Sequence, residues 1–485
     1  MHALCVLPPA GSVTDAEVAA AVADPSRWYD LTALPDDVQD ASPFADQLLI
    51  TLRSAWETAR GGTVSTFGAG SMLAVSIDDF VANGASASFT VLFEPPADGR
   101  VSLSDSAVTK NYLILETLDN VKSRLHFWKY ARGAGWSHCG AEKEAVTRGL
   151  SVSAVDPQSC DHYWLTVNSF LRPSTLCQGD AGLEVAGVAE AMALPMKALP
   201  AQFDASGCEE FQLEAVSADG TRIPYFIVRK TLGEGETATP VPTLLYGYGG
   251  FEIPILPNYM AVTGLTWLEK GFSYVTANIR GGGEFGPQWH QAALKQNRNK
   301  CYEDFIAVAE DLIARGLTTG PQLGIRGGSN GGLLMGNMYV QRPDLFGAVV
   351  CQVPLLDMHR FHKLLAGASW MAEYGDPDTA DWDGFLYRYS AYHNINPPTG
   401  TTAGLSTTPV KYPPLFMATS TRDDRVHPYH ARCFVKRLEE LDTPSVYYYE
   451  NMEGGHGGAA DNKQQAFITV LYNEFLYRHL GSLAK

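Results

Sequence analysis

The sharpest chemical signal in the sequence is a serine set among glycines, Gly327-Gly328-Ser329-Asn330-Gly331. This G-x-S-x-G element follows a predicted strand and opens a predicted helix, a context in which a tight turn holds the serine hydroxyl clear of a sheet. The context favours Ser329 as a nucleophile over an ordinary glycine-rich turn. Because a serine hydroxyl is a weak nucleophile, we expect a base and an orienting carboxylate later in the chain.

Both groups are found further on, each in a loop that follows a predicted strand. Asp423 opens the element Asp423-Asp424-Arg425-Val426, and His456 stands in Gly455-His456-Gly457. The order Ser, Asp, His is that of α/β-hydrolases, so we predict Ser329 as nucleophile, His456 as general base and Asp423 as its orienting partner. Taken singly, His456 would be a loop histidine, and Asp423 or Asp424 a solvated charge or a helix cap.

Acyl transfer also needs hydrogen-bond donors aimed at the developing oxyanion. The backbone N–H of Asn330, directly after the nucleophile, is one candidate. The second is the hydroxyl of Tyr248, which stands in the loop Tyr246-Gly247-Tyr248-Gly249-Gly250-Phe251 after a strong strand. Packing on these glycines is the alternative role for Tyr248.

Strands and helices alternate after Pro240, where they would position these groups. The predicted strands span 242–246, 272–279, 322–326, 347–352, 414–419 and 445–449, and the predicted helices span 302–315, 331–339, 429–440 and 461–479. This alternation predicts a mostly parallel sheet covered by helices on both faces. A hairpin is predicted at 211–228, with Asp219-Gly220 as its turn.

The first part of the chain has a different pattern, in which short runs of strand-forming residues are separated by turn residues. These runs span 47–52, 71–77, 88–93, 112–117, 123–130 and 163–167, and several have the spacing of an antiparallel sheet protein or of propeller blades. We therefore predict an α/β-hydrolase over 208–485, the catalytic domain, preceded by an all-β domain over 1–207.

The composition of the chain limits the classes of partner and the location that we expect for it. The 485 residues carry a formal net charge of −17, which disfavours nucleic acid and anionic membranes as partners. The eight cysteines form no C-x-x-C pair, which is typical of reduced thiols and a cytoplasmic protein, and no run approaches the roughly 18 apolar residues of a membrane span. No cofactor motif is found, and the pairs His359/His362 and His427/His430 have no third ligand at useful spacing, so no metal site is predicted.

Five segments together resemble the prolyl oligopeptidase family of serine peptidases. They are Tyr248-Gly249-Gly250-Phe251, Asn278 to Gly286, Gly327 to Gly332, Asp423 to Val426 and Gly455-His456-Gly457, in family order. The resemblance implies peptide-bond hydrolysis through an acyl-enzyme on Ser329, and it favours Asp423 over Asp424 as the triad acid. It also implies that Arg425 binds a substrate backbone carbonyl, whereas a surface ion pair with Asp424 is the alternative.

The same resemblance implies a pocket for proline. Trp370-Met371-Ala372-Glu373-Tyr374 matches the segment in which a Trp lies against the proline ring and a Tyr closes the pocket. The remaining pocket residues by the same match are Phe251, Asn330, Leu355 and Val426. Such an aromatic, apolar site suits a rigid ring, whereas the alternative for Trp370 and Tyr374 is a shared helix face in the core. Leu355, Ala366 and Ser369 depart from the family pattern, so outer pocket preferences are expected to differ.

The family places a seven-bladed propeller before the hydrolase. At about 40 to 45 residues per blade, the residues before 208 would make at most about four or five blades. We therefore expect 1–207 to be an incomplete β-propeller-like domain, whose open edge could support self-association. The predicted function is a serine oligopeptidase that cleaves short peptides after proline. The alternatives are a serine esterase or acyl-aminoacyl-type peptidase, and an inactive truncated hydrolase that acts as a binding protein.

Overall fold

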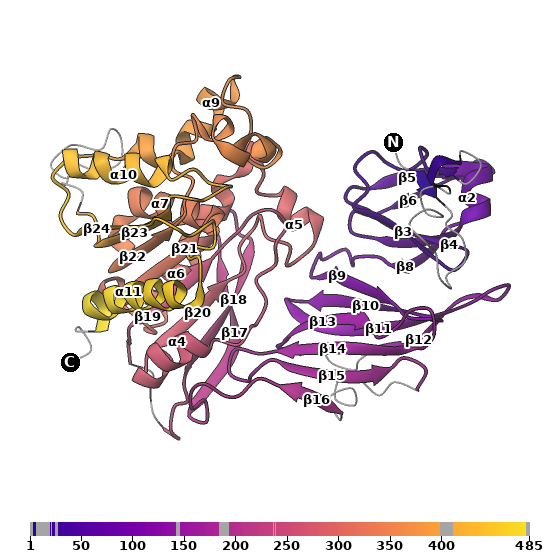
Figure 1. The fold of residues 1–485 in the computed structure, drawn as a ribbon, viewed down its shortest axis with the longest axis horizontal. Helices are drawn as coiled ribbons and strands as arrows, with labels where there is room; N and C mark the ends of the chain where they lie inside the picture. The colour runs from indigo at the N-terminus through magenta and orange to yellow at the C-terminus, as the bar shows by residue number, and fades with distance from the viewer. Residues whose placement is uncertain are drawn as a thin grey trace.

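An eight-stranded sheet organises the second half of the chain in the computed structural model (Figure 1). The structure describes residues 3–5, 20, 22–24, 28–141, 146–183, 194–235, 237, 239–397 and 411–481. The strand order is β17-β18-β20-β19-β21-β22-β23-β24. These strands are β17 (Cys208–Val216), β18 (Arg222–Lys230), β19 (Thr243–Gly247), β20 (Ser273–Ala277), β21 (Leu323–Gly328), β22 (Ala348–Gln352), β23 (Leu415–Ser420) and β24 (Val446–Asn451).

The strands from β20 across to β24 are mutually parallel, and the β17–β18 hairpin adds antiparallel strands at one edge. Consecutive residues of a strand belong to different cores. Leu245 and Val349 pack in one core, and Leu244 and Val350 pack in the other. Both faces of the sheet are therefore buried, as the continuous apolar runs predict.

Helices from different parts of the chain cover the two faces. Residues of α6 (Asn299–Ala314), α7 (Asn330–Gln341) and α10 (Tyr429–Glu440) pack in the core of Leu245, and residues of α11 (Asn462–Leu480) pack in the core of Leu244. The four predicted helices are confirmed, one of them with both ends as predicted and the others with shifts of one to three residues at their ends. The shorter helices α4 (Ala261–Thr266), α5 (Pro287–Gln291), α8 (Met371–Tyr374) and α9 (Asp381–Gly384) were not predicted.

The first half of the chain forms antiparallel sheets. Three have four strands, in the orders β3-β4-β7-β8, β12-β11-β10-β9 and β13-β14-β15-β16, the strand number of a propeller blade. Their strands are β3 (Asp40–Phe44), β4 (Gln47–Thr51), β7 (Met72–Ser76), β8 (Thr90–Phe93), β9 (Val101–Val108), β10 (Tyr112–Asp119), β11 (Lys122–Ala131), β12 (Gly135–Ala141), β13 (Gly149–Ala154), β14 (His162–Asn168), β15 (Thr175–Asp180) and β16 (Pro195–Ala198). The pairs β1 (Ala3–Cys5) with β2 (Trp28–Asp30) and β5 (Trp56–Arg60) with β6 (Thr63–Phe67) complete the region, together with the helix α2 (Ile77–Asn83), which the sequence pattern did not indicate.

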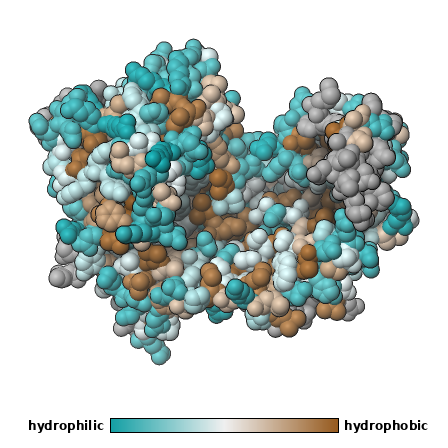
Figure 2. Space-filling model, in the orientation of Figure 1, coloured by the Kyte–Doolittle hydropathy of each residue, from teal (hydrophilic) through white to brown (hydrophobic). Residues whose placement is uncertain are grey.

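Polar contacts join the two halves of the molecule. Arg53, just beyond β4, pairs with Glu252 at 2.8 Å, and the Ser102 hydroxyl donates to the Glu284 carbonyl at 3.0 Å. The space-filling view in Figure 2 shows a concave boundary between the halves. Within the described residues, no helix combines the length and the hydropathy that crossing a bilayer requires.

Candidate active site

Ser329 occupies a strained turn between β21 and α7. Its φ of 58° and ψ of −119° are unfavourable for a residue with a side chain. The turn is held by the N–H of Ser329, which donates to the Gln352 carbonyl at 3.0 Å. A Cβ at Gly327 would lie 2.4 Å from the Gly331 carbonyl oxygen, so the glycines of the motif are needed for this close approach. The local chemistry is that of a nucleophile elbow.

His456 and Asp423 form the hydrogen-bonded pair that the sequence predicts. Nδ1 of His456 lies 2.7 Å from Oδ2 of Asp423. The Asp423 carboxylate is buried, and its other oxygen accepts the backbone N–H groups of Arg425 and Val426, each at 2.9 Å. An ionised carboxylate only accepts hydrogen bonds, so Nδ1 carries the proton and Nε2 is the basic nitrogen.

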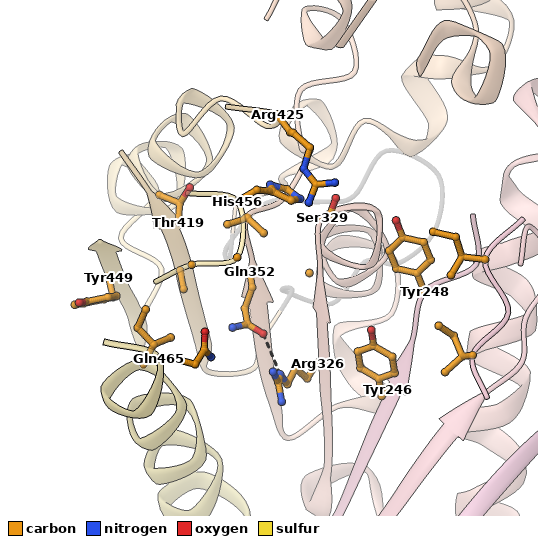
Figure 3. A pocket seen from close by; sticks show the side chains of 18 residues that line it. Tyr246, Tyr248, Arg326, Ser329, Gln352, Thr419, Arg425, Tyr449, His456 and Gln465 are labelled. Carbon is orange, nitrogen blue, oxygen red and sulfur yellow. Dashed lines mark hydrogen bonds between the residues drawn. The ribbon is translucent and has the colours of Figure 1, made fainter. Parts of the chain in front are cut away.

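Ser329 and His456 line the same cavity of about 490 Å³. Figure 3 shows them at one end of it, with Arg425 beside them and Tyr248 across from them. The turn after β21 and the loop after β24 thus bring together Ser329 and His456, which are 127 positions apart in the chain. The described residues that line the cavity are Tyr246, Tyr248, Ile253, Ile255, Arg326, Gly328, Ser329, Gln352, Val353, Ala418, Thr419, Arg425, Tyr449, His456, Gly457, Gly458, Gln465 and Ile468.

The two predicted oxyanion donors flank Ser329. Burial, followed by the neighbouring Tyr246, raises the pKa of Tyr248, so its hydroxyl remains protonated and able to donate. Asn330 is the first residue of α7, and the first N–H groups of a helix have no partner inside it. Its side chain donates to the Tyr248 carbonyl at 2.7 Å and so ties the two donors to each other.

The Asn330 side chain is also the end of a buried polar network that the sequence pattern did not reveal. Its Oδ1 accepts from the Tyr374 hydroxyl at 2.8 Å and from Arg298 Nη2 at 2.5 Å. Arg298 is fully buried, and its Nη1 binds Glu373 at 2.9 Å. His290 lies 2.7 Å from the other Glu373 oxygen.

Glu373 therefore has a structural role beside the predicted pocket, because it links segments of the chain through its hydrogen bonds. Burial alone would raise the pKa of its carboxyl, but the His290 hydrogen bond and the Arg298 charge outweigh burial and hold the pKa below its usual range. Its Oε1 also accepts the N–H of Phe251 at 3.0 Å. The only sequence signal for Glu373 was its place between Trp370 and Tyr374.

The predicted proline-pocket residues are gathered beside this network. The rings of Phe251 and Tyr374 are perpendicular at 5.7 Å, and Trp370 packs, partly buried, against the same core as Leu355 and Val426. None of these five residues lines the cavity that contains Ser329. Arg425 does line it, and although Arg425 and Asp424 are both described, no ion pair joins them.

One cluster has the composition of a metal site. Ligand atoms of His362, Asp376 and Asp378 lie within 4.8 Å of one another. Spacing along a helix could not reveal it, because both carboxylates come from a loop after α8. Lys363 donates to Asp378 at 2.7 Å and His362 lies 3.0 Å from the same residue, so these contacts already balance the Asp378 charge.

Comparison with known proteins agrees with this geometry. Residues 259–482 match the prolyl oligopeptidase family. The match includes the Ser329, Asp423 and His456 elements, and the predicted resemblance is thereby confirmed, as is the fold class of an α/β-hydrolase after an all-β region.

Relatives extend the likeness over most of the chain. An uncharacterised peptidase of Sinorhizobium fredii, y4nA, is 44% identical over 450 residues, which are 92% of this chain and 58% of that protein. A prolyl endopeptidase of Dictyostelium discoideum is 38% identical over 263 residues, 53% of this chain and 33% of its own length. A solved post-proline cleaving enzyme from Rickettsia typhi has a TM-score of 0.77 at 31% identity, over 94% of this chain and 61% of that one. The present chain thus spans less than two thirds of these family members.

Proposed function

We propose that this chain is a serine peptidase that cleaves short peptides on the carboxyl side of proline. The observation that carries the proposal is the buried Asp423–His456 pair, which opens onto the same cavity as Ser329 on its strained turn. The match of residues 259–482 to the prolyl oligopeptidase family supports the same chemistry.

The residues divide the reaction among themselves. Nε2 of His456 removes the proton from Ser329 as Oγ attacks the scissile carbonyl, and Asp423 stabilises the imidazolium that forms. The Tyr248 hydroxyl and the Asn330 N–H receive the oxyanion. His456 then gives the proton to the leaving amine, and a water molecule, activated by the same imidazole, hydrolyses the acyl-enzyme and regenerates Ser329.

The preference for proline over basic residues is supported by the contacts of the acidic side chain beside the pocket. Cleavage after Arg or Lys would need a carboxylate free to receive the basic side chain, and Glu373 is the acid beside the pocket. Both of its oxygens are already engaged, by Phe251 and Arg298 on one side and by His290 on the other. The aromatic rings of Phe251 and Trp370 remain for a compact apolar ring.

The proposal includes short peptides as substrates and the cytoplasm as location. The scattered cysteines and the acidic composition support that location. Self-association through an exposed strand edge of the first half is the further interaction that we propose for this form of the chain.

Paired substrates test the function. The purified chain is assayed on short peptide anilides that differ only in Pro, Ala or Arg before the scissile bond, beside labelling with a fluorophosphonate probe. We expect turnover of the proline substrate and labelling, both lost in Ser329→Ala. A preference for Arg, or turnover that survives Ser329→Ala, would contradict the proposal, and faster cleavage of an activated ester with none of the anilide would favour an esterase.

A further inference from the structure

The cavity at Ser329 extends along one face of the sheet, away from the proposed proline pocket. Tyr246 and Arg326, which both line the cavity, are paired neighbours on adjacent strands. Their side chains therefore lie on the same face of the sheet, and this face forms the floor of the cavity. A second row of neighbours on the same face runs from Gly328 through Gln352 and Ala418 to Tyr449. The helix α11 closes this side with Gln465 and Ile468, whereas α7 lies on the opposite face.

The lining of this cavity has an unusual charge for so acidic a protein. Among the described residues that line it are Arg326 and Arg425, and none of them is an Asp or a Glu. Figure 3 shows the two arginines at opposite ends of the cavity, with Ser329 and His456 close to Arg425. An anionic group that entered the cavity would meet positive charge and no acidic side chain.

Arg326 is held in place by two uncharged side chains. Its Nε donates to Gln352 Oε1 at 2.9 Å, and its guanidinium lies 4.0 Å from the ring centre of Tyr472. No carboxylate among the described residues forms an ion pair with it. A half-buried guanidinium pays a desolvation cost that an anionic ligand would offset, and its planar donors match a carboxylate well.

The residues that line the cavity indicate which part of a peptide substrate would bind in it. The loop residues His456, Gly457 and Gly458 form one wall. His456 must protonate the leaving amine, so the leaving peptide lies on the side of this loop. The proline-pocket residues Phe251, Trp370 and Tyr374 are absent from the lining.

We propose that this cavity receives the leaving part of a peptide substrate and that Arg326 binds its C-terminal carboxylate. The inference rests on the proposed function and adds a substrate class to it: peptides whose cleaved proline stands two or three residues before the C-terminus. Arg326 lies three residues before Ser329 on an extended strand, at most roughly 10 Å away between Cα atoms. A leaving dipeptide spans roughly 7 Å, and a tripeptide roughly 10 Å.

The test compares two N-acylated pentapeptides with proline at the third position, one ending in a free carboxylate and the other in an amide. We expect kcat/KM to favour the free acid about tenfold, the size expected of one charge-assisted contact. Arg326→Gln should bring the ratio close to one, Arg326→Lys should keep part of it, and the exposed-site control Arg437→Gln should keep all of it. Turnover of a proline anilide, whose leaving group has no carboxylate, should be similar in the parent and in Arg437→Gln. The acid-to-amide ratio is formed within each protein, so that a change in its basal rate cancels.

The outcomes separate the two proposals. Equal rates for acid and amide in the parent protein, or a ratio unchanged in Arg326→Gln, would overturn the Arg326 assignment while anilide turnover left the proposed function intact. Loss of Ser329-dependent anilide turnover in the parent would overturn the function itself. Inhibition of anilide turnover by the free product dipeptide, compared with its amide, checks the carboxylate contact in the parent protein without any substitution.

Discussion

Asp423 and Asp424 are neighbours in sequence with opposite environments. Asp423 is 4% exposed and bound to His456, whereas Asp424 is exposed. Two backbone N–H groups fix one Asp423 oxygen and leave the other for the imidazole. The environment, rather than the residue type, separates the acid that can orient a base from the acid that only carries charge.

Asp423→Asn should therefore lower kcat for a proline anilide by about 10⁴-fold, because an amide in place of the carboxylate favours the wrong imidazole tautomer and stabilises no imidazolium. Asp424→Asn is the matched control and should change kcat by less than about twofold, as expected of a surface charge. Steady-state kinetics on both variants, with circular dichroism to verify folding, gives the comparison. A larger loss in Asp424→Asn than in Asp423→Asn would reverse the assignment.

The residues that could be predicted from sequence are those with a local motif. Ser329 has its glycines, and Asp423 and His456 each stand in a short loop after a strand, so order and context were enough. Arg298, Glu373 and His290 have no such spacing, because they come from three separate segments and meet only in the folded core. Arg326 was not identified either, because a single arginine in an apolar strand indicates neither the face of the sheet on which it lies nor that no carboxylate of the described residues pairs with it.

Among the elements, the parallel strands were predicted well and the first-half strands only in part. Strands β19 to β23 are short apolar runs buried on both faces, which is a strong pattern. Strand β9 reads Val-Ser-Leu-Ser-Asp-Ser-Ala-Val and was missed, because a strand with polar side chains on one face resembles a loop. The short helices α5 and α8 depend on tertiary contacts for their stability, so no helical periodicity of apolar residues in the sequence predicts them.

The glycine-rich loop after β20 contains a buried acid whose ionisation should affect stability. Burial raises the pKa of Glu284 from 4.5 to about 7. One of its oxygens accepts from the Ile255 N–H and from Asn278, and the other has no hydrogen-bond partner among the described residues. The folded state therefore prefers the protonated carboxyl.

Because the folded-state pKa lies above that of the unfolded chain, Glu284 stabilises the fold most at low pH, and this contribution is lost as the pH rises from about 4.5 to about 7. The loss amounts to about 3 kcal/mol in the free energy of unfolding. Glu284→Gln should remove it, so the variant should gain stability relative to the parent between pH 5 and pH 8. Urea unfolding at both pH values measures this, with exposed-site Glu57→Gln as the control, and a difference between variant and parent that does not change with pH would contradict it.

At the scale of the whole molecule, a line of charges leads from the first half to the active site. Arg53 pairs with Glu252, which lies 3.6 Å from His290, and His290 in turn contacts Glu373. Glu252 and Phe251 both have positive φ, near 58°, so this loop is held in a strained form. The same loop begins with Tyr248, the proposed oxyanion donor. The first half of the chain thus helps to fix the loop on which catalysis would depend.

Arg53→Gln should loosen that loop without unfolding either half. The Arg53 side chain is 39% exposed, so its ion pair with Glu252 is expected to contribute about 0.5 to 1 kcal/mol, which corresponds to roughly two- to fivefold faster local opening. Hydrogen exchange should accelerate by that factor in peptides covering residues 248–256 and stay unchanged in α10. Arg132→Gln is the matched control, because Arg132 pairs with Asp46 within the first half. High salt should reproduce the effect in the parent, since it screens a partly exposed pair. Unchanged exchange at residues 248–256 in Arg53→Gln would show that the glycines and Glu373 hold the loop alone.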